Sequence, residues 1–299
     1  MIDNENIYYS SCRLCARECG VDRTRVNGGC GVGSELLVAR ASLHAWEEPP
    51  ISGTRGSGTI FFSGCSLGCS FCQNREISGG RVGKTVTTDR LADIMLELEG
   101  RGAHNINLVT PTHYVPSIIR AIDRARGLGL TLPIVYNTSS IDTPDTLRML
   151  EGYVDIYLAD YKYNTEKTAQ ALTRVKNYTA AARLAIAEMV RQRPTPTIED
   201  GLMKSGVIVR LLLLPAHVAE AKLSVKYLYE TYGDSIIMSL MSQYTPMEGV
   251  AAPLDRPVTA AEYDELVAYA LRKGVKNAYI QEDGAARESF IPPFDLTGV

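Results

Sequence analysis

Short apolar runs alternate repeatedly with helical patterns along this sequence, and this alternation leaves few possible folds. The runs show little alternation between apolar and polar positions, as expected for parallel strands buried on both faces. They occupy residues 58–63, 105–110, 132–137, 154–160, 207–214 and 235–241. Six such units in succession predict an α/β protein with a parallel sheet, either open or curled into a barrel.

The segments between these runs carry signals for helices. Helices are predicted within residues 87–102, 115–129, 142–152, 166–192 and 218–233. The first of them has Thr88 or Asp89 as its expected cap and Gly100 as its expected end. In sheets of this kind the ligand binds at the carboxyl ends of the strands, where the loops converge. We therefore expect the functional residues in the loops that follow the strands.

Two segments lie outside this alternation and suggest a division of the chain. Residues 1–54 contain four cysteines and end in the Pro-rich stretch 46–53, WEEPPISG. Residues 247–299 offer a further helix, a short strand and a Pro-rich tail, SFIPPFD. We predict a Cys-rich metal-binding segment over 1–54, a catalytic core over 55–246 and a short extension over 247–299.

Composition and charge limit the kinds of partner that the protein is expected to bind. The chain has 299 residues, of which 45% are hydrophobic and 22% charged, and its formal net charge is −3. Such a balance gives no sign of a surface for nucleic acid or for acidic membranes. The polar, acidic beginning of the sequence is unlike a signal peptide, and no window reaches the length of a membrane span. The sequence therefore predicts a cytoplasmic protein with neither nucleic acid nor membrane as partner.

The seven cysteines are bunched near the beginning of the sequence. They occupy positions 12, 15, 19, 30, 65, 69 and 72. A disulfide framework would be more dispersed and would be reduced in the cytosol, so metal binding is the better interpretation.

Three of these cysteines, Cys65, Cys69 and Cys72, follow the first predicted strand with the spacing C-x3-C-x2-C. Gly64 and Gly68 in the same stretch let the backbone wrap closely around a bulky inorganic cluster. An Fe4S4 cube normally takes four thiolates, so three leave one iron for a ligand that is not protein. One alternative is a zinc site with a fourth ligand from elsewhere, but no histidine lies at the spacing of a zinc knuckle. The other is a set of buried free cysteines.

This loop resembles that of the radical S-adenosylmethionine (SAM) superfamily. Within it, the sequence is most similar to a separate branch of the pyruvate formate-lyase activating enzymes, which activate glycyl radical enzymes. The stretches that carry the resemblance are CRLCARECGVDR, EEPPISG, FSGCSLGCSFCQN, NINLVTPTHYVP and LMSQYTP.

The resemblance implies a partial (β/α)6 barrel similar to a TIM barrel, with a [4Fe-4S] cluster on Cys65, Cys69 and Cys72. S-Adenosylmethionine would be chelated at the free iron. The reduced cluster would cleave it to a 5′-deoxyadenosyl radical that takes a hydrogen atom from the substrate. The family also implies anaerobic chemistry, an electron donor such as flavodoxin or ferredoxin, and a glycyl radical enzyme as protein substrate.

Several residues match the site of the activating enzymes. Phe71 is the aromatic residue before the third cysteine, and Asp160-Tyr161-Lys162 matches an Asp-x-Lys at the end of strand four. By this resemblance Lys162 helps to hold the cofactor and Asp160 lines the site, which makes them the candidate catalytic residues. The alternative is an ordinary surface pair at the end of a strand.

Other positions depart from the family pattern. The glycine-rich turn after strand two is replaced by 109–112, where Thr110 and Thr112 are expected to take over binding of the cofactor. After strand three, Asn137 and Ser139 stand within the stretch that replaces the usual Asp-Thr-Asn-Gly. These changes leave the cofactor chemistry intact but bear on the substrate.

Arg210 lies inside the apolar run 207–214, where an unpaired charge would be costly. If its side chain points into the barrel, it can bind the carboxylate of the cofactor through two hydrogen bonds. The alternative is a salt bridge to a neighbouring strand.

The first four cysteines, Cys12, Cys15, Cys19 and Cys30, have the spacing C-x2-C-x3-C-x10-C. Four thiolates on short loops make a closed site for zinc or for a second Fe–S cluster, and the spacing leaves both open. The alternative is a set of reduced cysteines in a small core.

Two other functions stay open at this point. A radical SAM enzyme can act directly on a small molecule or a peptide. An Fe–S electron carrier is the alternative without catalysis, although six β/α units are far more scaffold than such a carrier requires.

Overall fold

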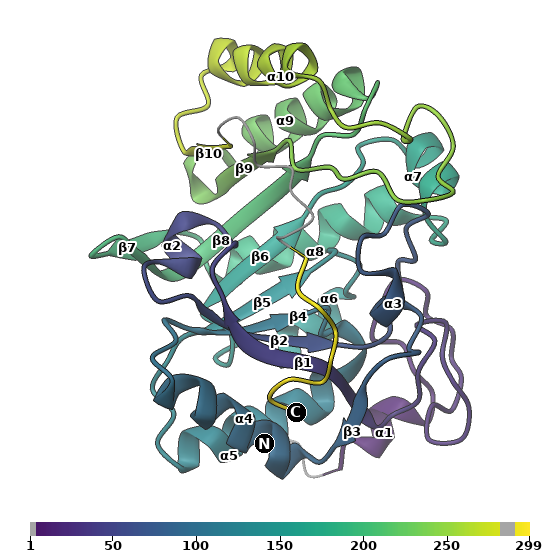
Figure 1. Ribbon diagram of the computed structural model, residues 1–299, viewed down its shortest axis with the longest axis vertical. Helices are drawn as coiled ribbons and strands as arrows, with labels where there is room; N and C mark the ends of the chain where they lie inside the picture. The colour runs from purple at the N-terminus through teal and green to yellow at the C-terminus, as the bar shows by residue number, and fades with distance from the viewer. Residues whose placement is uncertain (1–3, 282–290) are drawn as a thin grey trace.

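A computed structural model describes residues 4–281 and 291–299 of the chain, and its centre is one large sheet (Figure 1). The strand order is β10-β9-β8-β6-β5-β4-β2-β1-β3, and β7 pairs with β8 at the side of this path. The strands are β1 (Leu36–His44), β2 (Ser57–Phe62), β3 (Lys84–Val86), β4 (Ile106–Val109), β5 (Ile134–Thr138), β6 (Ile156–Asp160), β7 (Thr197–Glu199), β8 (Leu202–Leu212), β9 (Ile237–Met241) and β10 (Ala278–Ile280).

The six predicted strands are confirmed as a parallel set. They are β2, β4, β5, β6, β8 and β9, and each pairs in parallel with the next. All six residues of β2 are buried, as the absence of alternation in its sequence indicates. The sheet ends at β3 on one side and β10 on the other, so the barrel is partial and open.

Two of the described helices precede the parallel strands, and the others lie in the connections between them. The helices are α1 (Asn6–Tyr9), α2 (Pro49–Ser52), α3 (Arg75–Ser78), α4 (Thr88–Gly100), α5 (Val115–Gly127), α6 (Pro144–Met149), α7 (Glu166–Leu172), α8 (Tyr178–Gln192), α9 (Val218–Tyr232) and α10 (Ala260–Lys273), with short 3-10 helices at Thr112–Tyr114 and Gly233–Ser235. Among the described helices none is long and apolar enough to cross a membrane.

Two details of the helices differ from the sequence-based expectation. The cap of α4 is Thr87, whose hydroxyl accepts the N–H of Arg90, so the helix begins one residue after it. The segment 166–192 forms two helices, α7 and α8, instead of one. The first ends because Thr173 takes an extended backbone and its hydroxyl bonds the carbonyl of Ala169.

The amino-terminal residues contribute a strand that the sequence analysis did not predict. β1 runs antiparallel to both β2 and β3, so it joins the main sheet. After it, α2 contacts β8. Ile51 of α2 packs against Val135, Leu158 and Ile208 of the parallel strands. The stretch WEEPPISG therefore lies across the sheet, with α2 in front of β8 in Figure 1.

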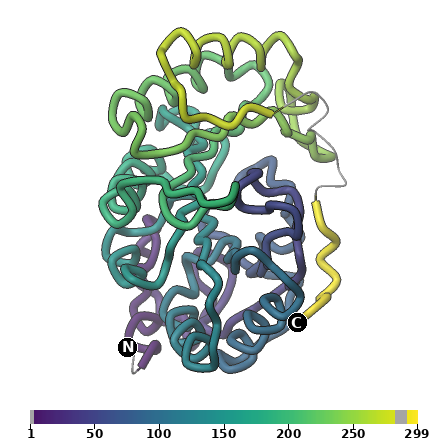
Figure 2. The backbone as a smooth tube through the Cα atoms, turned by 90° about the vertical axis from the view of Figure 1, so that its left-hand side faces the viewer, coloured from purple at the N-terminus to yellow at the C-terminus, as the bar shows by residue number. Residues whose placement is uncertain are grey.

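The residues 291–299 run along β1. The N–H of Ala41 donates to the carbonyl of Thr297 at 2.9 Å, and the N–H of Leu296 donates to the carbonyl of Ala39 at 3.1 Å. Figure 2 shows this yellow segment on one side of the molecule. Of the predicted Pro-rich tail, residues 289 and 290 lie outside the described residues. The boundaries proposed at 54 and 246 stay predictions, although strands from both flanks join the sheet.

Candidate functional site

The three-cysteine loop follows β2 directly and lines a cavity of about 260 Å³ at the carboxyl ends of the parallel strands. Gly64 and Gly68 in this loop have φ values of +89° and +65°, which L side chains rarely adopt. A Cβ on Gly64 would also lie 2.7 Å from the side chain of Val32. The glycines therefore permit both the turn and its close contact with the amino-terminal segment.

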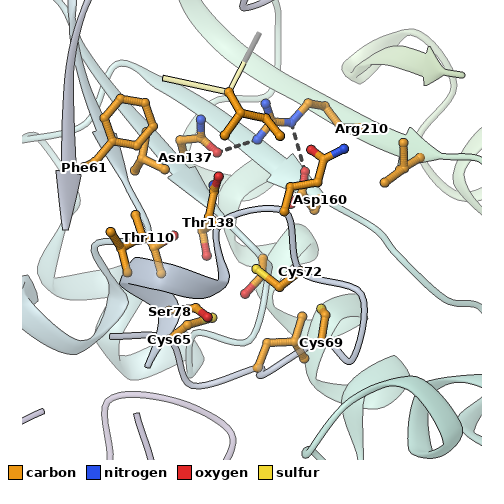
Figure 3. Close-up of a pocket in the computed structure, with 18 of the residues that line it drawn as sticks. Phe61, Cys65, Cys69, Cys72, Ser78, Thr110, Asn137, Thr138, Asp160 and Arg210 are labelled. Carbon is orange, nitrogen blue, oxygen red and sulfur yellow. Dashed lines mark hydrogen bonds and ion pairs between the residues drawn. The ribbon is translucent and has the colours of Figure 1, made fainter. Parts of the chain in front are cut away.

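Figure 3 shows Cys65, Cys69 and Cys72 around the lower part of the cavity, and Asn137, Asp160 and Arg210 above them. Burial raises the pKa of Cys69 to about 12, although the ammonium of Lys162 opposes this shift. Burial also raises the pKa of Cys72, and the neighbouring Cys65 adds to the effect. Burial therefore favours the neutral thiols of Cys69 and Cys72, and a bound cation would favour their thiolates.

A polar network of charged side chains forms the opposite wall. Arg210 of β8 donates from Nε to Asp160 Oδ1 at 2.9 Å and from Nη1 to Glu47 Oε2 at 3.1 Å. Its remaining terminal nitrogen, Nη2, donates to the side-chain oxygen of Asn137. Lys162 Nζ lies 2.8 Å from the second oxygen of Asp160. Three strands, β5, β6 and β8, and two loops thus meet at one charged cluster.

This arrangement bears on the two interpretations of Arg210. Its nitrogens are directed to Asp160 on the neighbouring strand, to Glu47 and to Asn137, which is the arrangement of the salt-bridge alternative. Its role in binding the cofactor stays a prediction, because that role requires an N–H of Arg210 to exchange one of these partners for a carboxylate.

Asp160 and Lys162 form a partly buried pair inside the cavity, with side chains about one fifth exposed (21% and 20%). Burial opposes the charge of Asp160, but Arg210 and Lys162 outweigh it, so the pKa of Asp160 lies below its usual value. The N–H of Lys162 also donates to the hydroxyl of Tyr178 at 2.8 Å. The pair is therefore held in place and differs from an ordinary surface pair.

Most of the other predicted cofactor residues line the same cavity. Phe71, Thr110 and Ser139 are among its walls, and Thr110 has a φ of +58°. Thr112 is not among the lining residues. It belongs to the short 3-10 helix after β4, which buries its hydroxyl 3.5 Å from that of Thr138.

Segments on both flanks of the parallel strands supply wall residues that were not among the predicted site residues. His44, Trp46 and Glu47 reach the cavity from the segment after β1, and Ile291 and Pro292 reach it from the carboxyl-terminal segment. The pair of glutamates before Pro-Pro in WEEPPISG was the sequence signal that could have placed this segment in the site. Nothing in the local pattern of residues 291–299 indicates a place in the site.

The amino-terminal cysteines form a second group beside the loop. Cys12, Cys15 and Cys30 are buried, and Cys19 is exposed. Within residues 4–281 and 291–299, no three side chains of His, Cys, Asp or Glu already stand in the arrangement of metal ligands, and this holds for both groups of cysteines.

The donor set of the loop fits a [4Fe-4S] cluster. Three thiols from one glycine-containing loop line a single cavity, as a cluster with one free iron requires. The side chains of Lys162 and Arg210, in the same cavity, would face the negative charge of such a thiolate-bound cluster.

Comparisons with known proteins agree with this site. Residues 59–207 match the family model described as the Radical SAM superfamily, which implies a [4Fe-4S] cluster and S-adenosylmethionine. The uncharacterized protein MJ0674 of Methanocaldococcus jannaschii is 28% identical over 246 residues, which cover 80% of this chain and 67% of that protein.

Two solved structures share the fold at low sequence identity. Native anSMEcpe with bound AdoMet has a TM-score of 0.51 and 10% identity, and the match covers 71% of this chain and 58% of that one. Streptococcus suis SuiB bound to the precursor peptide SuiA has a TM-score of 0.50 and 11% identity, with coverages of 74% and 47%. The chain thus spans about half the length of these proteins. From its loop, its sheet and its match to the family model, this chain carries a radical SAM superfamily domain over residues 59–207.

Proposed function

We propose that this protein uses the cavity at the carboxyl ends of its strands to generate a radical on a glycyl radical enzyme. The observation that carries the proposal is that Cys65, Cys69, Cys72, Asp160 and Lys162 all line that cavity. When bound, the [4Fe-4S] cluster and S-adenosylmethionine supply a 5′-deoxyadenosyl radical that takes a hydrogen atom from the substrate.

In this proposal the residues of the chain bind the cluster and orient the cofactor. The three cysteines hold the cluster, and Lys162, fixed by Asp160 at 2.8 Å, presents an ammonium to the cofactor side of the cavity. Asn137 and Arg210 fix the opposite wall. The Asp-x-Lys at the end of β6 is the feature shared with the activating enzymes. The open edge of the sheet supports a macromolecular substrate, because a partial barrel leaves room at its side for a peptide loop.

A test of this proposal uses spin resonance. The reduced enzyme and S-adenosylmethionine are incubated anaerobically with each candidate glycyl radical enzyme from the same cell. We expect the doublet signal of a glycyl radical in one of them. Absence of the signal across the full set, together with cofactor turnover on a metabolite extract, would contradict activation of a protein.

A second candidate is direct action on a small polar molecule, and one observation favours it. Glu47 from the amino-terminal part and Ile291 and Pro292 from the carboxyl-terminal part line the cavity, so segments outside the parallel strands narrow it. In the same experiment this candidate predicts turnover on the metabolite extract with no protein radical.

A further inference from the structure

A buried arginine without an acidic partner lies among the amino-terminal cysteines. Arg23 is only 1% exposed, and no described Asp or Glu forms an ion pair with it. Its nitrogens donate to the backbone carbonyls of His113 and Gly33. Its guanidinium carbon lies 5.1 Å from the centre of the Tyr9 ring.

These partners leave the charge of Arg23 uncompensated. Arginine stays charged at any pH a protein experiences. Taking such an ion out of water costs several kcal/mol, even after the protein has relaxed around it. Neutral carbonyls and aromatic rings offset only part of this cost. A buried guanidinium in this position is therefore expected to face an anion.

The groups that face Arg23 in this place are cysteine sulfurs. Nη1 of Arg23 lies 3.8 Å from Sγ of Cys12. A Cβ built on Gly28 would lie 3.1 Å from Cδ of Arg23 and 3.3 Å from Sγ of Cys30. The sulfur of Cys30 therefore also lies near the Arg23 side chain. Sγ of Cys19 lies 3.9 Å from the carbonyl of Cys12, and Cys15 is also buried.

We propose that Cys12, Cys15, Cys19 and Cys30 bind a second metal centre as thiolates, and that Arg23 is its buried counter-ion. Four thiolates around a zinc ion, or around an oxidised [4Fe-4S] core, carry a net charge of about −2 in either case. The positive charge of Arg23 offsets part of it. The shared chemistry is a closed tetrathiolate site, and metal analysis distinguishes zinc from iron.

The centre would brace the catalytic loop. The N–H of Cys65 donates to the carbonyl of Cys30 at 3.0 Å. Nε of Arg17 donates to the carbonyl of Ser66 at 2.6 Å. One ligand of the proposed centre is thus hydrogen-bonded to one ligand of the loop, and a metal that orders residues 12–30 also fixes the start of the loop.

The first measurement is metal content. A variant with Cys65, Cys69 and Cys72 all changed to Ala is purified anaerobically and analysed by native mass spectrometry and elemental analysis. We expect one zinc ion or one set of cluster irons per chain to remain, and a further change of Cys30→Ala to remove it. No metal in the triple variant would overturn the proposal. The result does not depend on cofactor cleavage, so it is distinct from the test of the proposed function.

The second measurement isolates Arg23. Arg23→Met is compared with Arg25→Met, whose side chain is 84% exposed, in a competition with a metal chelator. Loss of a group that supports metal ligands typically lowers affinity on the order of 10- to 100-fold. We expect a loss in that range for Arg23→Met, partial rescue by Arg23→Lys and no change for Arg25→Met. Equal affinity of Arg23→Met and wild type would remove Arg23 from this role. If Arg23→Met does not fold, the metal content of the triple variant still decides whether the site exists.

Discussion

Changing Cys69 to Ala is expected to abolish the release of 5′-deoxyadenosine from S-adenosylmethionine. The loop supplies three thiols to the cavity, and the loss of one leaves the cluster with two protein ligands. The measurement is anaerobic reconstitution of the variant, reduction with dithionite and chromatography of the products, with iron counted on the same sample.

The matched control for this prediction is Ser70→Ala. Ser70 is the next residue in the loop and its side chain is exposed, so cleavage should persist at the rate of the wild type. Release of 5′-deoxyadenosine by the Cys69→Ala protein would show that the assignment of the cluster to this loop is wrong.

The second large effect is expected from Arg210→Met. Arg210 is 12% exposed in its side chain and pairs with Asp160 and Glu47, which are 21% and 9% exposed. Its removal leaves Glu47 without the cation it pairs with and leaves Asp160 with Lys162 alone. Breaking a buried ion pair in this way costs about 3–5 kcal/mol in the free energy of unfolding. Urea denaturation at pH 7 measures this loss. Arg272→Met, on the exposed surface of α10, is the control and should change stability by less than about 0.5 kcal/mol.

The pH dependence of this loss has a definite sign. The pKa of Asp160 in the folded protein lies below its usual value, because Arg210 and Lys162 outweigh the effect of burial. A depressed pKa contributes stability above the pKa of the unfolded chain, and the contribution is lost as the pH falls through the folded value. The difference between wild type and Arg210→Met should therefore shrink as the pH falls below about 4. A difference that stays constant with pH would show that Arg210 stabilises by packing alone.

The parallel strands could be predicted from the sequence because each is apolar on both faces. β1 escaped prediction for the opposite reason. Arg40 and Ser42 interrupt its apolar residues, and the strand forms only when the chain has folded back so that β1 pairs with β2. The strand therefore depends on tertiary pairing that local patterns do not record.

In the site, too, some features could be predicted from neighbouring residues and others depend on residues far apart in the sequence. Asn137 and Asp160 could be placed at strand ends, and both line the cavity. The bond between Asp160 and Arg210 follows from the register of β6 and β8, in which the two residues are directly paired. The contact of Arg210 with Glu47 joins residues 163 positions apart. Neither the register nor this contact is encoded in a window of neighbouring residues.

Because segments from both flanks of the parallel strands line the cavity, its walls are synthesised at different times. The cysteines of the loop and the first strands leave the ribosome before Ile291 and Pro292 are made. Amino-terminal parts of a chain can fold during synthesis. A cluster can therefore be loaded into a nascent chain whose cavity still lacks one wall, and the finished enclosure forms only after translation has passed residue 292.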